Sequence, residues 1–201
     1  KFIGGGKGGT KPIIFGLIGV IPLAAHGIAL QVTSLTFMFH LGLSQASTVR
    51  VGYYVGMKDM VNLKECAIVA LILSLSIVLV TMFAFLVFPE TLLDLFIAPE
   101  DPVKNGIVSV GISLLFVASV FQIFDAGQVM VLGILRGFQD TKIPMIIAAF
   151  GYWILGLPMC YYIGIHLNFG GSGVWMGLVL GLAVVCILLI FRLFSVYKKY
   201  S

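Results

Sequence analysis

The sequence predicts an all-α, polytopic membrane protein, and three observations lead to this prediction. Hydrophobic residues make up 60% of the 201-residue chain and charged residues only 10%. The mean hydropathy is +1.14, far above the values of soluble domains. Long uncharged windows alternate with short charged ones. We therefore expect the chain to cross a membrane several times as helices, because a helix satisfies its own backbone hydrogen bonds in lipid.

About 20 apolar residues are enough for one crossing, and apolar windows of this length recur along the chain. Residues 12–49 carry no formal charge, which is too long for one ordinary span, and Pro22 is expected to divide them. The Gly-rich turn at 164–173 divides the last long window in the same way. The predicted segments are a partial span at 12–20 and five full spans at 22–49, 64–88, 103–136, 143–164 and 172–194.

Helix-start signals agree with these divisions. Asn62 with Glu65 three residues later resembles a capping box, and Asp101 before Pro102 offers an N-cap followed by a proline of the first turn. The first eleven residues, KFIGGGKGGTK, fit neither a signal peptide nor a complete helix. We interpret 1–11 as the atypical start of a fragment and 12–199 as one membrane lobe.

The cations predict an orientation, because cytoplasmic loops attract Lys and Arg. The eight cations on one side are Arg50, Lys58, Lys64, Arg136, Lys142, Arg192, Lys198 and Lys199. The opposite side has Lys104 alone, beside Glu90, Asp94, Glu100 and Asp101. The C-terminus and the loops at 50–64 and 136–142 are therefore expected in the cytoplasm, with 89–104 outside. The net charge of +4 is a signal of topology, and no nucleic-acid partner is predicted.

Asp125 lies alone in the middle of an apolar helix, VASVFQIFDAGQVMVLGILRG. A carboxylate at mid-span costs of order 3 kcal/mol, so it is expected to face a cavity as a protonatable or cation-binding group. The alternative is a structural carboxyl bonded to a neighbouring helix. Gln122 and Gln128 lie three residues to either side on one broad face, and all three are expected to line the same cavity.

Other polar side chains extend this predicted cavity. Gln31 and Ser34 share a face of their helix by their i, i+3 spacing, although hydrogen bonding between helices would explain them equally well. His26 and His40 are about 21 Å apart along that helix, so they cannot share one metal ion. The cysteines lie singly, without CxxC spacing, and predict neither a metal site nor a disulfide.

Two aromatic residues, Tyr152 and Trp153, lie about ten residues into their span, deeper than an interfacial belt requires. They would suit flat cationic molecules through cation–π attraction, and packing between helices is the alternative. Pro158 removes the hydrogen bond to the carbonyl of Ile154 and is expected to kink this helix, which gives it a hinge.

Arginines end two of the predicted helices in similar contexts. Arg50 and Arg136 are each followed by an acid, Asp59 and Asp140 respectively. One interpretation is snorkelling at the cytoplasmic interface. The sharper interpretation is an inner gate formed by Arg136 and Asp140.

The chain resembles the MATE family, the multidrug and toxic compound extrusion transporters, and most of all its NorM branch. IPLAAHGIALQVTSLTFMFHLGLSQASTVRVGYYVG (21–56) is similar to the eighth helix of these transporters. VLGILRGFQDTKIPMII (131–147) and YWILGLPMCYYIG (152–164) are similar to their tenth-to-eleventh helix region. The resemblance covers about 21–199.

This resemblance implies a lobe of six helices out of twelve, in the bacterial inner membrane, with an N-terminal lobe as its partner. It implies antiport without a cofactor, in which Na+ or H+ enters and organic cations leave. Asp125 matches the coupling acid, and Gln31 matches a position that often bears an amide. Phe121 stands where relatives often have a cavity-lining tyrosine, and the expected partner glutamate would fall near Gly4, so the coupling ion stays open.

Two alternatives remain at this stage. GGSG (170–173) fits the GxSG of rhomboid proteases, but no histidine follows Ser172 to activate it, and Ser172 is expected to cap a helix. A lipid-linked substrate flippase of the same superfamily shares the two-lobed fold but carries a more cationic cavity. The predicted mid-span cavity holds Asp125 and no Lys or Arg. This favours cationic or zwitterionic drugs as the cargo.

Overall fold

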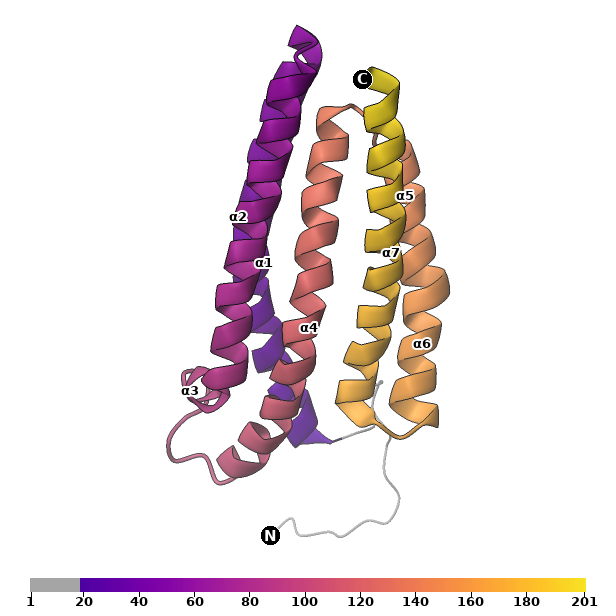
Figure 1. Cartoon of the computed structure of the whole chain (residues 1–201). Helices are drawn as coiled ribbons and strands as arrows, with labels where there is room; N and C mark the ends of the chain where they lie inside the picture. The colour runs from indigo at the N-terminus through magenta and orange to yellow at the C-terminus, as the bar shows by residue number, and fades with distance from the viewer. Residues whose placement is uncertain (1–18) are drawn as a thin grey trace.

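The computed structural model describes residues 19–201, and this part of the chain is a bundle of helices (Figure 1). In chain order the elements are α1 (Val20–Met57), α2 (Met60–Val87), α3 (Pro89–Asp94), α4 (Lys104–Gly137), α5 (Lys142–Ala149), η1 (Phe150–Gly156), α6 (Leu157–Tyr161), η2 (Tyr162–His166) and α7 (Gly170–Tyr200). The segments α5 to η2 form one continuous helix. Five helices of the described part are long and apolar enough to cross a membrane, which confirms the five predicted spans. The predicted segment 1–11 and nearly all of the partial span 12–20 lie outside the described residues.

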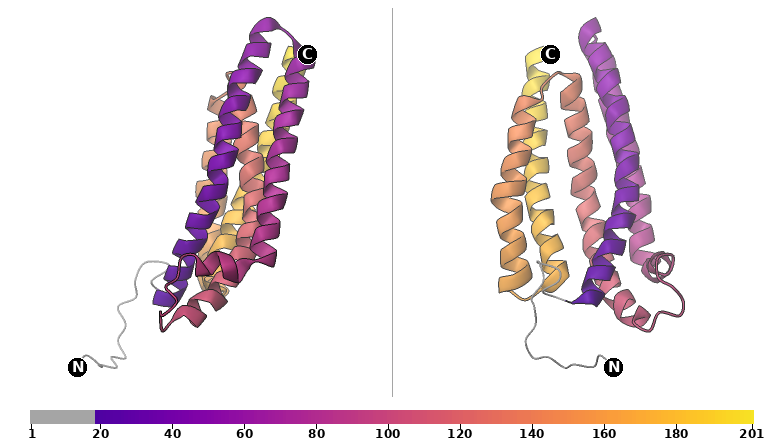
Figure 2. Two further views of the ribbon diagram at one scale, coloured as in Figure 1. Left: turned by 90° about the vertical axis from the view of Figure 1, so that its left-hand side faces the viewer. Right: turned by 180° about the vertical axis from the view of Figure 1, so that it is seen from behind.

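Helix α4 runs through the middle of the bundle. Helices α1 and α2 lie on one side of it, and α7 with the α5–η2 helix lies on the other (Figures 1 and 2). One cluster of buried apolar side chains, which includes Leu115 and Trp175, lies toward the α3 end. A second, which includes Ile134 and Leu189, lies toward the opposite end. The middle helix therefore contributes to both halves of the core.

Close backbone packing fixes the register of α1 against α4. A Cβ atom added at Gly133 would lie 2.3 Å from the Ser44 hydroxyl oxygen, so only glycine fits there. Ser44 donates to the carbonyl of Val129 at 2.8 Å, and Thr48 donates to the carbonyl of Gly133 at 2.8 Å. Small residues and interhelical hydrogen bonds are the usual means of joining helices in lipid, where apolar burial offers little.

The ends of the bundle separate the charges as the sequence predicted. The α1–α2 turn, the α4–α5 turn and the C-terminus lie at one end (Figure 1). Helix α3 and the turn before α7 lie at the other end (Figure 1). The eight cations therefore belong to one end, and Lys104 pairs with Asp94 at the other, at 3.0 Å. Which end faces the cytoplasm remains a prediction.

The first turn of the chain is shorter than expected, because α1 continues to Met57 and the predicted loop at 50–64 is largely helical. Val51 is fully buried, and Gly52 lies close to the backbone of Gly137. Packing against α4 thus extends the helix beyond Arg50. The chain then reverses at Lys58, which has a left-handed backbone with φ of 55°.

Two predicted helix caps are wrong. Asp59 is the N-cap of α2, and its carboxylate accepts from the backbone N–H of Asn62 at 3.1 Å and from the Asn62 amide. Asn62 therefore supplies donors to the cap and is not the cap itself. Helix α4 begins at Lys104, later than expected, because the Asp101 carboxylate accepts from the backbone N–H of Val103 in a turn that precedes the helix.

The helix that contains Pro158 has two π-helical stretches, η1 and η2. In η1 the backbone N–H of Leu157 bonds to the carbonyl of Tyr152, five residues earlier. This wider turn directly precedes the proline, which has no N–H to give to the usual carbonyl. Glycines hold this helix against α7, since a Cβ at Gly177 would lie 2.4 Å from the backbone nitrogen of Cys160.

Candidate functional site

Asp125 lies near the middle of α4, and its side chain is half-buried. Among residues 19–201, no side chain or backbone group gives its carboxylate a hydrogen bond or an ion pair. The predicted structural alternative required a bond to a neighbouring helix, and the described helices offer none. A partly buried carboxylate without a fixed partner is suited to bind a proton or a cation.

Gln128 and Tyr152 stand beside this carboxylate. The Tyr152 hydroxyl donates to the Gln128 side-chain carbonyl at 2.6 Å. Gln128 lies one helical turn after Asp125 on α4 and is buried, so its bond to Tyr152 brings η1 to the part of α4 that carries Asp125. We call Asp125, Gln128 and Tyr152 the Asp125 cluster. It brings together one carboxylate, one amide and one phenol from two membrane helices.

The π-helical stretch η1 positions Tyr152, and π-helical turns are frequent at functional sites. Trp153, the next residue, is 71% exposed and lies on the outside of the described bundle. Adjacent residues of a helix do not face the same neighbour. Only one of the two predicted aromatic residues therefore joins the cluster.

Gln122 faces a different neighbour from Gln128. Its side-chain carbonyl accepts from the Thr81 hydroxyl of α2 at 2.7 Å. Two residues six positions apart on an α-helix point about 120° away from each other, so Gln122 contacts α2 while Gln128 contacts η1. Asp125 lies between them on the helix. Phe121 packs edge-on against Trp175 with ring centroids 5.3 Å apart and belongs to the core around it.

Gln31 and Ser34 lie together on an exposed face of α1, beside a groove that Leu35 and Phe96 also line. The bonds from Ser44 and Thr48 to α4 place Asp125 level with His40. Gln31 is therefore about 13 Å nearer the α3 end than Asp125. The structure keeps the two predicted α1 residues together, but away from the Asp125 cluster.

The predicted gate pair is not formed in this structure. Asp140 accepts from Arg192 of α7 at 2.7 Å, and Arg136 reaches back to Ser44 at 3.4 Å. The backbone reverses at Gln139, whose φ is 62°, and this turn directs Asp140 toward α7. Arg50 is exposed and has no ion pair within the described residues.

The comparisons with known proteins agree with this architecture. The MatE family model matches residues 12–162, three quarters of the chain. The chain belongs to the MATE family. The predicted resemblance is thereby confirmed, and so is the all-α fold class.

MATE proteins are transporters and not enzymes, so the alternative of a rhomboid-type protease is excluded. Ser172 is the third residue of α7, whose N-cap is Phe169, so the predicted cap at Ser172 is wrong.

Relatives within the family are NorM proteins. The "Probable multidrug resistance protein NorM" of Rhizobium meliloti is 42% identical over 189 residues, which are 94% of this chain and 40% of that protein. The "Multidrug resistance protein NorM" of Burkholderia vietnamiensis is 41% identical over 177 residues, 88% of this chain and 38% of that protein. The chain thus spans about two fifths of the length of these relatives.

Solved MATE structures share the fold. The eukaryotic MATE transporter AtDTX14 superposes with a TM-score of 0.76 at 18% identity, over 90% of this chain and 40% of that one. An outward-facing multidrug resistance MATE family transporter gives a TM-score of 0.75 at 23% identity, over 88% and 39%. This MATE chain therefore has the helix arrangement of one lobe.

Several polar contacts of this lobe were missed from the sequence. His40 bonds to Ser74 of α2 at 2.9 Å, Trp175 bonds to His26 at 2.8 Å, and Arg192 bonds to Asp140. Each joins residues at least 34 positions apart. The residue types gave a signal, because buried polar groups in membrane helices need partners, but the spacing could not say which partner.

Proposed function

We propose that this chain is the C-terminal lobe of a cation-coupled multidrug efflux antiporter of the bacterial inner membrane, with its C-terminus in the cytoplasm. The N-terminal lobe of the same transporter is its partner, and organic cations or zwitterions are its cargo. The names of its NorM relatives support multidrug export. The half-buried Asp125 carboxylate without a described partner is the observation that carries the coupling role.

The Asp125 cluster has the chemistry of a small cation site. A proton can neutralise the carboxylate directly, and the carboxylate oxygens can also hold Na+, since hard cations prefer oxygen ligands. The coupling ion is therefore Na+ or H+. A cation bound at Asp125 opposes an organic cation nearby, and this coupling acts equally in both directions.

Alternating access then follows from movement of this lobe against its partner. We propose that Gln128, Tyr152 and the exposed Gln31 and Ser34 line the drug pathway. Each of these side chains offers hydrogen bonds without adding a positive charge. The flippase alternative requires a cationic cavity, but every described Lys and Arg lies toward a helix end. Cationic and zwitterionic drugs therefore fit this lobe better than a lipid-linked substrate does.

Replacement of Asp125 in the full-length transporter tests this proposal. Asp125→Asn keeps the shape of the side chain but cannot titrate, so it should insert normally and lose ethidium export driven by an imposed Na+ or H+ gradient. Asp125→Glu should keep part of the activity with a displaced pH or Na+ dependence. Gln128→Ala is the matched variant one turn away and should change drug preference more than coupling.

One result would contradict the coupling role of Asp125. If Asp125→Asn is present at the wild-type level and exports drug against a gradient at the wild-type rate, Asp125 is a structural carboxyl. The proposed coupling role would then be wrong, whereas membership of the family would stand.

A further inference from the structure

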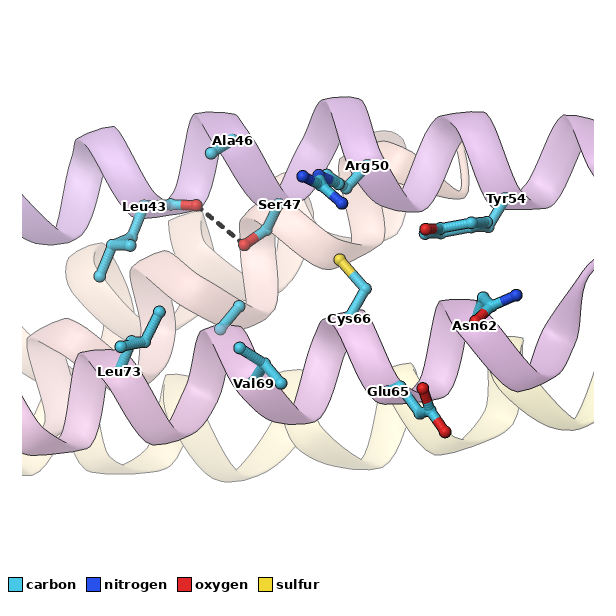
Figure 3. A pocket seen from close by; sticks show the side chains of 11 residues that line it. Leu43, Ala46, Ser47, Arg50, Tyr54, Asn62, Glu65, Cys66, Val69 and Leu73 are labelled. Atoms are coloured by element: carbon cyan, nitrogen blue, oxygen red, sulfur yellow. Dashed lines mark hydrogen bonds between the residues drawn. The ribbon is translucent and has the colours of Figure 1, made fainter.

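A cleft of about 380 Å³ opens between α1 and α2 near the turn that joins them (Figure 3). Figure 3 shows Ser47, Arg50 and Cys66 directed toward the space between the two helices, whereas the Glu65 carboxylate points away from α1 at the edge of the cleft. The α1 side is lined by Leu43, Ala46, Ser47, Arg50 and Tyr54. The α2 side is lined by Asn62, Glu65, Cys66, Val69, Ala70 and Leu73.

The cleft changes from polar to apolar along its length. Arg50 and Glu65 lie toward the turn, and Leu43 and Leu73 lie farther into the span (Figure 3). Arg50 and Leu43 are about 10 Å apart along the helix. The turn belongs to the cation-rich end of the bundle, where helices meet the lipid headgroups. A molecule with a charged head and an apolar tail therefore matches the cleft.

The two charges in the cleft are unpaired within the described residues. Arg50 and Glu65 both line the cleft, and neither forms an ion pair with the other or with any other described side chain. A guanidinium binds phosphate through two parallel hydrogen bonds. A carboxylate nearby repels a purely anionic head but attracts an ammonium group. The pair thus favours a head that carries both a phosphate and an ammonium.

We propose that this cleft is a binding site for a zwitterionic phospholipid of the phosphatidylethanolamine type. The phosphate binds Arg50, the ammonium binds Glu65, and one acyl chain lies against Leu43 and Leu73. The Tyr54 hydroxyl lies at the same polar end and can donate to the phosphate. The bound lipid fills the space between α1 and α2, and its binding needs no coupling role for Asp125.

Native mass spectrometry of the full-length transporter tests the site. The protein is equilibrated with equal amounts of phosphatidylethanolamine and phosphatidylglycerol, and the retained lipid is counted. The wild type should retain phosphatidylethanolamine preferentially. Arg50→Gln should lower its occupancy roughly tenfold, since a charge-assisted bidentate contact is lost. Glu65→Gln should shift the preference toward phosphatidylglycerol.

Two further variants guard against misfolding and general charge effects. Ala46→Phe fills the apolar part without changing charge and should also remove the lipid. Lys64→Gln changes a cation at the same end that does not line this cleft and should leave occupancy unchanged. The proposal is overturned if the wild type shows no preference, or if Arg50→Gln and Ala46→Phe retain phosphatidylethanolamine as the wild type does.

Discussion

Trp175 of α7 donates its indole N–H to Nδ1 of His26 on α1 at 2.8 Å. The two rings meet edge-on, with centroids 5.7 Å apart, and Trp175 is only 1% exposed. Because α1 and α7 lie on opposite sides of α4 (Figures 1 and 2), this bond joins the two halves of the bundle. An indole can only donate, so Nδ1 of His26 accepts only while it carries no proton.

Trp175→Phe should therefore destabilise the lobe more than a conservative aromatic change suggests. The variant keeps a large ring but loses this hydrogen bond, which costs about 1 kcal/mol. The free energy of unfolding in mixed micelles of the full-length transporter measures the loss. Trp153→Phe is the matched control, since Trp153 is 71% exposed. Equal effects of the two substitutions would show that the Trp175 bond contributes nothing.

The Asp140–Arg192 pair should couple measurably. Its Nε and Oδ2 atoms are 2.7 Å apart, and the two side chains are 15% and 27% exposed. A double-mutant cycle with Asp140→Asn and Arg192→Gln should give a coupling free energy of about 1 kcal/mol. The Lys104–Asp94 pair at the other end is the comparison, because Asp94 is 48% exposed. A coupling no larger than that of Lys104–Asp94 would contradict this expectation.

The spans could be predicted from the sequence because membrane insertion depends on local properties. Length, apolarity and the absence of charge are sufficient to identify a crossing. The end of α1 could not be predicted in this way. Residues 50–57 contain two glycines and an arginine, and they stay helical because Val51 and Gly52 pack against α4. Tertiary packing overrides weak local preference there.

The candidate site was predictable in part. The high cost of a mid-span carboxylate identified Asp125 from the sequence alone. The partners were not predictable, because the periodicity of α4 says which residues share a face but not which helix lies opposite. Gln122 and Gln128 were expected in one cavity, yet α2 and η1 lie at different angles around α4 and take one glutamine each.

The Asp59 cap of α2 should make the folding stability of the lobe depend on pH in the acid range. Hydrogen bonds from the Asn62 amide and backbone hold the pKa of Asp59 below its ordinary value. A carboxyl with a lowered folded pKa stabilises the fold above its unfolded pKa, about 3.9. That stabilisation disappears as pH falls through the lower folded pKa. Asparagine is also a good N-cap, so Asp59→Asn should keep the helix start at neutral pH and lose this pH dependence.

Thermal unfolding of wild type and Asp59→Asn between about pH 6 and about pH 3 checks this prediction. The stability advantage of the wild type should shrink toward the acid end. Asp59→Ala should be less stable than Asp59→Asn at neutral pH, since it has no capping group. A difference between wild type and Asp59→Asn that stays constant over the whole range would contradict the prediction.

Tyr152→Phe should separate the structural and functional roles of the Asp125 cluster. The substitution removes only the hydroxyl that donates to Gln128 at 2.6 Å. The free energy of unfolding should therefore fall by about 1 kcal/mol relative to the wild type. Tyr161→Phe is the control in the same helix, because Tyr161 is 61% exposed. If the cluster lines the drug pathway, Tyr152→Phe should change the ranking of exported drugs and preserve gradient-driven export, since Asp125 remains.

The double variant Gln128→Ala with Tyr152→Phe should change the ranking of exported drugs no more than Gln128→Ala alone, because the hydroxyl acts through that amide. Additive losses, or the same change of drug ranking in Tyr161→Phe, would show that the Tyr152–Gln128 bond plays no part in drug recognition.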